Sequence, residues 1–111
     1  MNYQVIVTEP AEQDIDSNVY WWSKNRSAAQ SLRWYDGILL TIDSLEEQPQ
    51  RCPLVHEDEQ FSEEIRELHY GIGSRPTHRI IFTIHSEVVL VLAVRHAAQA
   101  DLTAADLPQL Q

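Results

Sequence analysis

Residues 65–96 decide the fold, and they read IRELHYGIGSRPTHRIIFTIHSEVVLVLAVRH. Three runs rich in β-branched and aromatic residues, 65–70, 77–85 and 88–96, are joined by short turns, which is typical of consecutive strands. The Ser86-Glu87 dipeptide between the last two runs predicts a two-residue β-hairpin connection. We therefore expect an antiparallel sheet in this part of the chain.

The run 88–96 is apolar on both of its faces. A strand with this pattern is buried on both sides, so we expect it at the centre of the sheet. The short β-branched run 2–8 is the natural neighbour at its open side. Helices would then cover one face, and another segment the other. A short helix beginning at Thr103 could give that second cover, or the face could await a partner.

Apolar residues recur at helical spacing between residues 8 and 45. Thr8 can cap a first helix that has Pro10 in its first turn. The apolar stripe of this helix consists of Ala11, Ile15, Val19 and Trp22. The pattern ends near residue 25, so the first helix is expected to stop there.

A second helix is expected to begin at Ser27, because Ser27 to Gln30 has the form of a capping box. Its expected apolar stripe consists of Leu32, Tyr35, Ile38, Leu39, Ile42 and Leu45. The short connection makes the two helices an antiparallel hairpin. Three indole rings on it, from Trp21, Trp22 and Trp34, would fill the seam between the helices, or could support a homodimer.

Charge is distributed unevenly along the chain. Its formal net charge is -9, yet residues 65–99 contain four arginines and two acidic residues. An acidic protein repels phosphate backbones, so a general nucleic-acid binder is excluded. The arginines are either solvated groups on the polar face of a sheet or part of a site.

Composition and length predict one domain over residues 1–111. No apolar run approaches the roughly 20 residues that span a bilayer, and no export signal is visible at the N-terminus. The single cysteine, Cys52, excludes an internal disulfide and fits a cytoplasmic protein. No neighbouring base is evident for Cys52, so we do not expect it to be a nucleophile.

The polar stretch 48–64 is expected to be a solvated loop. Its run His56-Glu57-Asp58-Glu59 contains possible metal ligands. It lacks the spaced partner ligands that dedicated metal sites use, so we expect no metal there.

Several short motifs in this order resemble a known family. They are Trp21-Trp22, Arg26 to Ala29, Pro49 to Leu54, Glu64 to Leu68, Tyr70-Gly71, His78 to Phe82 and Ala93 to Ala97. Together they resemble the RelE/ParE superfamily of toxins from bacterial type II toxin-antitoxin systems. The resemblance implies an α+β, two-layer fold of order β-α-α-β-β-β, with an antiparallel sheet packed on a helical hairpin and a short C-terminal helix.

The resemblance implies one of two activities. RelE-like members are similar to ribonucleases that cut messenger RNA on the ribosome, and this is the activity that we expect. ParE-like members resemble inhibitors of DNA gyrase that need no such chemistry. A protein that retains the fold without toxicity is a third reading. A cognate antitoxin is implied as the partner, and no cofactor is indicated.

Four residues are the candidates for RNA cleavage: Arg66, Arg79, Arg95 and His96. Histidine can transfer a proton near neutral pH, and arginine can hold a phosphate. Arg66 and His96 stand where the ribonucleases of the superfamily commonly carry these residue types. The nearby tyrosine of those enzymes is replaced by alanine at Ala97 and Ala98, and acidic residues replace their lysines. Alternatively, the arginines pair with carboxylates, and His96 caps the last strand by bonding a backbone carbonyl.

Overall fold

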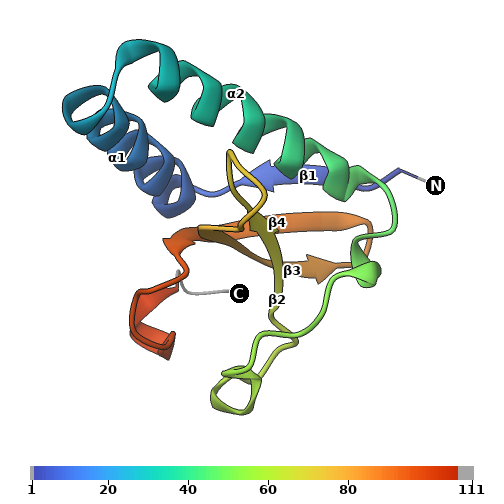
Figure 1. Ribbon diagram of the computed structural model, residues 1–111. Coiled ribbons are helices and arrows are strands. Elements are labelled where there is room, and N and C mark those ends of the chain that lie inside the picture. The colour runs from blue at the N-terminus through green and yellow to red at the C-terminus, as the bar shows by residue number, and fades with distance from the viewer. Residues whose placement is uncertain (1, 108–111) are drawn as a thin grey trace.

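A hairpin of two helices lies over one face of a four-stranded sheet (Figure 1). The computed structural model describes residues 2–107. The helices and strands are β1 (Gln4–Val7), α1 (Glu9–Asn25), α2 (Ala28–Asp43), β2 (Arg66–Tyr70), β3 (His78–His85) and β4 (Val88–His96). The α+β class and the expected order of elements are therefore confirmed. Neither helix in this part of the chain combines the length and the apolar character needed to cross a membrane.

The sheet has the strand order β1-β4-β3-β2, so β4 is central and β1 is its neighbour, as expected. One part of the expectation is wrong, because the sheet is mixed. β1 runs parallel to β4, while β4, β3 and β2 are antiparallel to one another. A parallel pair needs a long crossover connection, which the chain between Val7 and Val88 supplies. The pattern of apolar residues along a strand does not reveal whether that strand runs parallel or antiparallel to its neighbour.

A β-bulge interrupts the pairing of β3 with β4. Ile81 pairs with Ala93, but the next residue, Phe82, pairs with Val91, so Leu92 is an extra residue in β4. Leu92 and Ala93 both pack into the core on the face that lies away from the helices. The bulge thus lets one strand supply two neighbouring side chains to the same core.

Both faces of β4 are buried, as the sequence predicts. On the helix side, Trp34, Ile38, Ile80, Phe82 and Val91 belong to the main core. On the opposite side, a smaller core consists of Val55, Ile65, Ile81, Leu92, Ala93 and Leu102. The second cover therefore comes from the 48–64 loop and from the segment around Leu102. A single 3-10 turn, Ala104–Asp106, with a capping box on Thr103, stands where the short terminal helix is expected.

The stripe of α1 is buried or half-buried as expected. The stripe predicted for α2 is correct in its second part, where Ile38, Ile42 and Leu45 are buried, but it is wrong at Leu32 and Tyr35. Leu32 is 61% exposed and Tyr35 is 37% exposed. The buried face passes instead through Ser31 and Trp34, because the Ser31 hydroxyl donates a hydrogen bond to the Val19 carbonyl of α1 at 2.8 Å. Ser31 thus lies in the contact between the two helices, and the apolar residues Leu32 and Tyr35 beside it remain exposed to solvent.

The three tryptophans do not share one role. Trp34 is fully buried and Trp22 packs partly against the main core. Trp21 is 46% exposed, so the expectation that it fills the interhelical seam is wrong. The next residue, Trp22, packs against the main core, and Trp21 projects from another side of α1.

Replacing Gly37 by alanine should destabilise the protein. In most helices this change stabilises by about 1 kcal/mol. Here an added Cβ would collide with the hydroxyl of Tyr70, which donates to the Trp34 carbonyl at 3.0 Å. We expect Gly37→Ala to lower the free energy of unfolding by about 1–3 kcal/mol, measured by urea denaturation. The loss should be smaller in a Tyr70→Phe background, and equal losses in both backgrounds would contradict the collision.

Candidate functional site

Arg79 is buried on the face of the sheet opposite the helices. Its Nη1 and Nη2 donate to the two carboxylate oxygens of Glu57 at 3.0 and 2.8 Å, and its Nε donates to Glu67. Arg79 is 7% exposed, and the side chain of Glu57 is fully buried. Two carboxylates therefore neutralise the guanidinium and accept from three of its five N–H groups, which leaves it little capacity to hold a phosphate.

Glu57 itself corrects the expectation of a fully solvated loop. Its Oε2 also accepts the backbone N–H of Leu102 at 2.7 Å, so one carboxylate joins the loop, the sheet and the C-terminal segment. Burial alone would raise the pKa of Glu57, but the hydrogen bonds from Arg79 and Leu102 outweigh it and lower the pKa to about 2. Glu57 is therefore ionised in the folded protein above that pH.

Arg95 lies beside Arg79, since the two residues pair across β4 and β3. Its Nη2 donates to the Ala100 carbonyl at 2.8 Å, and its Nη1 is 4.0 Å from a carboxylate oxygen of Asp106. Arg95 thus fastens the segment that follows β4 to the sheet.

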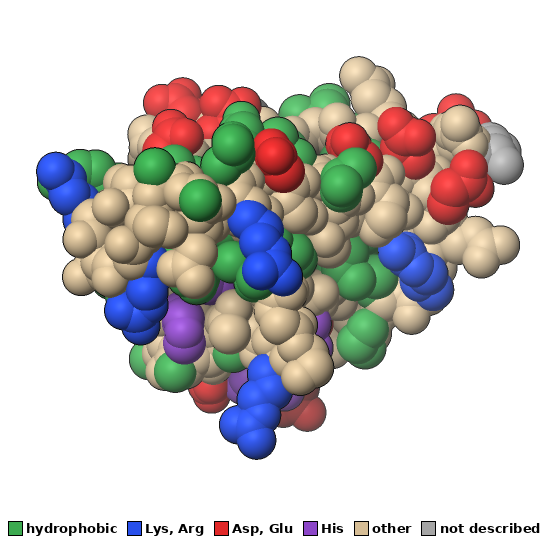
Figure 2. All heavy atoms as spheres, turned by 45° about the horizontal axis from the view of Figure 1, so that its top comes forward, with side chains coloured by type: hydrophobic (Ala, Val, Ile, Leu, Met, Phe, Trp, Pro, Cys, Tyr) green, Lys and Arg blue, Asp and Glu red, His purple; other side chains and the backbone are tan. Residues whose placement is uncertain are grey.

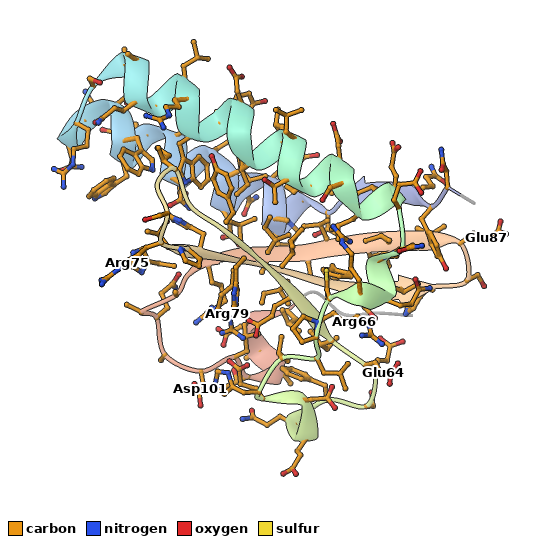
Figure 3. The ribbon with its side chains drawn as sticks, turned by 45° about the vertical axis from the view of Figure 1, so that its right-hand side comes forward. Glu64, Arg66, Arg75, Arg79, Glu87 and Asp101 are labelled. Atoms are coloured by element: carbon orange, nitrogen blue, oxygen red, sulfur yellow. The ribbon has the colours of Figure 1, made fainter. Side chains whose placement is uncertain are left out.

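Arg66 lies at the start of β2 and on the face that the helices cover. It donates to the Cys52 carbonyl at 2.7 Å and lies 3.6 Å from Glu64. Figure 3 shows Arg66 next to Glu64 and at the opposite end of the sheet from Arg75. Its contacts hold the 48–64 loop against the edge of the sheet.

His96 is exposed at the end of β4. Its Nδ1 accepts the backbone N–H of Ala98 at 3.0 Å, so in the neutral ring the proton belongs on Nε2. The expected alternative, a bond to a backbone carbonyl, is thus replaced by a bond to a backbone N–H. The ring meets His78 edge to face at 5.2 Å between centroids.

The four predicted site residues do not converge. Arg79 and Arg95 lie on one face of the sheet, and Arg66 and His96 on the other. Arg66 pairs with Phe82 and His96 with His78, so their positions differ by four residues along β3. Four residues of a strand correspond to about 13 Å. A single phosphate cannot reach all four side chains in this arrangement.

A cleft of about 520 Å³ lies beside His96 instead. It is lined by Ser17, Asn18, Trp21, Trp22, Thr77, His78 and His96. Sequence reasoning had assigned the tryptophans to the core and had given His78 and Asn18 no role. One feature of the sequence could have indicated that Trp21 lines a cleft: it lies near the end of the first helix, shortly before the helical pattern breaks.

His78 forms the polar floor of this cleft. Its Nε2 donates to Asn18 Oδ1 at 2.9 Å, and its Nδ1 accepts from the Thr77 hydroxyl at 2.8 Å. Burial, together with the nearby charge of His96, lowers the pKa of His78 to about 4. His78 is therefore neutral near pH 7, and both of its ring nitrogens have partners.

Three possible metal ligands, His56, Glu57 and Asp101, come together at the loop. The oxygens of Glu57 are already bonded to Arg79 and Leu102, and the guanidinium of Arg79 opposes a second cation. His56 bonds Asp101 at 2.8 Å, and this bond raises the pKa of His56. The cluster is satisfied as a network of hydrogen bonds and ion pairs.

Cys52 is buried in the main core. Burial raises the pKa of its thiol above the ordinary value, and the nearby Arg51 and Arg66 offset this in part. A buried thiol with a raised pKa is a poor nucleophile. This environment agrees with the expectation that Cys52 is not catalytic.

Helical hairpin, mixed sheet and element order together define the fold of the RelE/ParE superfamily of toxins. Residues 5–101 match the model of the family described as the ParE toxin of type II toxin-antitoxin system, parDE. Because this match spans most of the sequence, the chain belongs to the ParE toxin family and is a toxin of a type II toxin-antitoxin system.

Of the two solved structures compared next, the first agrees with this chain at the level of the fold. The chromosomal ParDE toxin-antitoxin system of P. aeruginosa is similar with a TM-score of 0.68 and 14% sequence identity, over 85% of this chain and 95% of that one. The toxin-antitoxin complex RelBE2 from Mycobacterium tuberculosis has a TM-score of 0.43 and 19% identity, over 86% and 99% of the two chains. No curated protein sequence gives a significant match.

Replacing Glu57 by glutamine should destabilise the protein strongly. The change leaves the buried guanidinium of Arg79 with Glu67 as its remaining carboxylate partner. Breaking a buried ion pair from one side costs about 3 kcal/mol or more, which urea denaturation at pH 7 should detect. Glu59→Gln, at an exposed position two residues away, is the matched control and should change stability by less than about 0.5 kcal/mol.

The same variant should reveal the pH dependence of this pair. The pKa of Glu57 in the folded state is about 2, below its ordinary value of 4.5. The stabilisation is therefore complete above about pH 4.5 and is lost as the pH falls toward about 2. The stability difference between the parent and Glu57→Gln should shrink to less than about half by pH 3. A difference that stays constant from pH 7 to pH 3 would contradict the assignment.

Proposed function

We propose that this toxin arrests growth by binding a protein target, DNA gyrase, and not by cutting messenger RNA. The observation that carries the proposal is the separation of Arg66 and His96 and the neutralisation of Arg79 by Glu57 and Glu67. ParE-like members of the superfamily resemble gyrase inhibitors, and the family match points to that branch.

RNA cleavage through a 2′-hydroxyl needs a base, an acid and cations that stabilise the charge on phosphorus, all within hydrogen-bond reach of one phosphate. His96 could transfer a proton, but none of the arginines predicted to assist it shares its site. Arg95, its neighbour in the chain, extends from the opposite face of β4 and holds the Ala100 carbonyl. Inhibition by binding requires no such convergence, and it is the better fit to this geometry.

We further propose that the cognate antitoxin covers the outer face of the helical hairpin. A shallow groove there is lined by Val19, Ala28, Leu32 and Tyr35, and Leu32 is 61% exposed. An adjoining groove adds the acidic residues Glu12 and Asp16. An amphipathic antitoxin segment with apolar anchors and basic flanks would match this surface, whereas a strongly acidic segment would not.

Leu32→Asp should weaken binding of the cognate antitoxin by about tenfold or more, because it places a charge in the apolar groove. Isothermal titration of the purified toxin with the antitoxin measures this directly. Leu40→Asp is the matched control, since Leu40 is on the same helix, is 71% exposed and does not line the groove. Equal losses in the two variants, or no loss in either, would remove the hairpin groove from the antitoxin interface.

His96→Gln should leave toxicity intact, since the proposal assigns no proton transfer to His96. Thymidine and methionine incorporation are followed together during the first minutes after induced expression in a bacterium. We expect thymidine incorporation to fall first, in parent and variant alike. An early loss of methionine incorporation that His96→Gln relieves by about 100-fold would instead establish messenger RNA cleavage. Normal incorporation of both labels would indicate a protein without toxicity in that host.

A further inference from the structure

Three segments of this acidic chain contain no carboxylate: residues 17–35, 68–86 and 88–100. They contain six of the eight Lys and Arg residues. All side chains that line the cleft beside His96 come from these segments. Figure 2 shows one face, where most red side chains lie along the top and right and the purple ones lie in the lower part, while blue ones are spread from left to right. The lining of the cleft therefore includes no carboxylate, although the protein has a net charge of -9.

Cations around the cleft are not used in ion pairs. Within residues 2–107, Lys24, Arg26 and Arg75 form no salt bridge, in contrast to Arg79 and Arg95. Arg26 lies over the ring of Trp21, with its guanidinium carbon 5.4 Å from the centroid. Arg75 precedes the cleft residue Thr77 by two positions, and Figure 3 shows it at the end of the sheet. These charges are available to an anionic partner.

The walls of the cleft are aromatic. Trp21 and Trp22 stand perpendicular to each other, with 5.4 Å between their centroids. On the floor, the polar atoms of Asn18, Thr77 and His78 are already bonded to one another. A ligand that is recognised through many hydrogen bonds would therefore have few unbonded polar atoms to contact in this cleft. An apolar or aromatic side chain finds indole surface to pack against, and the Nε2–H of His96 can bond one acceptor.

We propose that this cleft binds an acidic segment of a protein partner. The segment inserts one apolar or aromatic side chain against Trp21 and Trp22 and places its flanking carboxylates near Arg26 and Arg75. Trp and Arg are the residues that most often dominate the energy of protein interfaces, and here they adjoin one pocket. A volume of about 520 Å³ is large enough for one aromatic side chain and its neighbours.

This surface is separate from the apolar hairpin groove proposed for the antitoxin and from the adjoining groove that contains Glu12 and Asp16. The inference does not depend on gyrase being the target, because it rests on the cleft and the charges around it. A single-stranded nucleic acid would also offer aromatic rings and negative charge. It is disfavoured, since the bulk charge of the protein repels a phosphate backbone and the floor of the cleft has few free groups to contact base edges.

The test is selection from a randomised peptide library displayed on phage, with the intact purified toxin as bait. We expect the enriched peptides to share one apolar or aromatic residue flanked by Asp or Glu. Synthetic peptides of that consensus should lose affinity by about tenfold or more toward Trp21→Ala, and by several-fold toward Arg75→Gln. Raising the salt concentration should weaken binding to the parent protein.

Matched controls are Tyr20→Ala and Arg51→Gln. Tyr20 is exposed next to Trp21 but does not line the cleft, and Arg51 lies away from it, so both variants should bind like the parent. Circular dichroism checks that each variant is folded. Failure to enrich any peptide, enrichment of neutral or basic peptides, or equal effects of Tyr20→Ala and Trp21→Ala would overturn the proposal. Tighter binding of a thymidine oligonucleotide than of the acidic peptides would also overturn it.

Discussion

The buried ion pair between Glu57 and Arg79 is the interaction on which the second layer of this protein depends. One carboxylate, with no exposure to solvent, holds a loop, a central strand and, through the Leu102 N–H, the segment after β4. Without that attachment, the apolar residues of β4 on this face would lose their cover. Burying two charges is costly unless further hydrogen bonds stabilise them, and here the additional bonds from Leu102 to Glu57 and from Arg79 to Glu67 do so.

This structural use of Arg79 also limits the chemistry available to the toxin. A guanidinium held by two carboxylates cannot serve a phosphate, and Arg95 and Arg66 fasten backbone carbonyls at separate places. The exposed His96 then lacks the cationic neighbours that a ribonuclease site requires. What adjoins His96 is an aromatic cleft with Arg26 over the ring of its wall residue Trp21, a surface suited to contact with another macromolecule. This arrangement supports the proposal that the toxin acts by recognising a partner rather than by cleaving a bond.

Much of the fold could be predicted because its signals are local. The alternation in residues 77–85, the doubly apolar run 88–94 and the cap at Ser27 each predict an element from a few neighbouring residues. The errors concern contacts between distant parts of the chain. The sequence gives no sign that Glu57 is buried, because its partners Arg79 and Leu102 are distant in the chain. Leu32 fits the apolar stripe by its spacing, but the hydrogen bond from Ser31 to α1 turns another side of α2 toward the core. The parallel pairing of β1 and the exposure of Trp21 likewise follow from packing that periodicity does not encode.

Supercoiling of relaxed plasmid by purified DNA gyrase tests the central claim most directly, with the purified toxin and its His96→Gln variant added in parallel. The account predicts that both proteins inhibit supercoiling to the same extent, and that neither cuts messenger RNA in a reconstituted translation reaction. Unimpaired supercoiling, together with cleavage of ribosome-bound messenger RNA that His96→Gln abolishes, would contradict it. That result would mean that His96 finds its catalytic partners in the ribosome rather than in this chain.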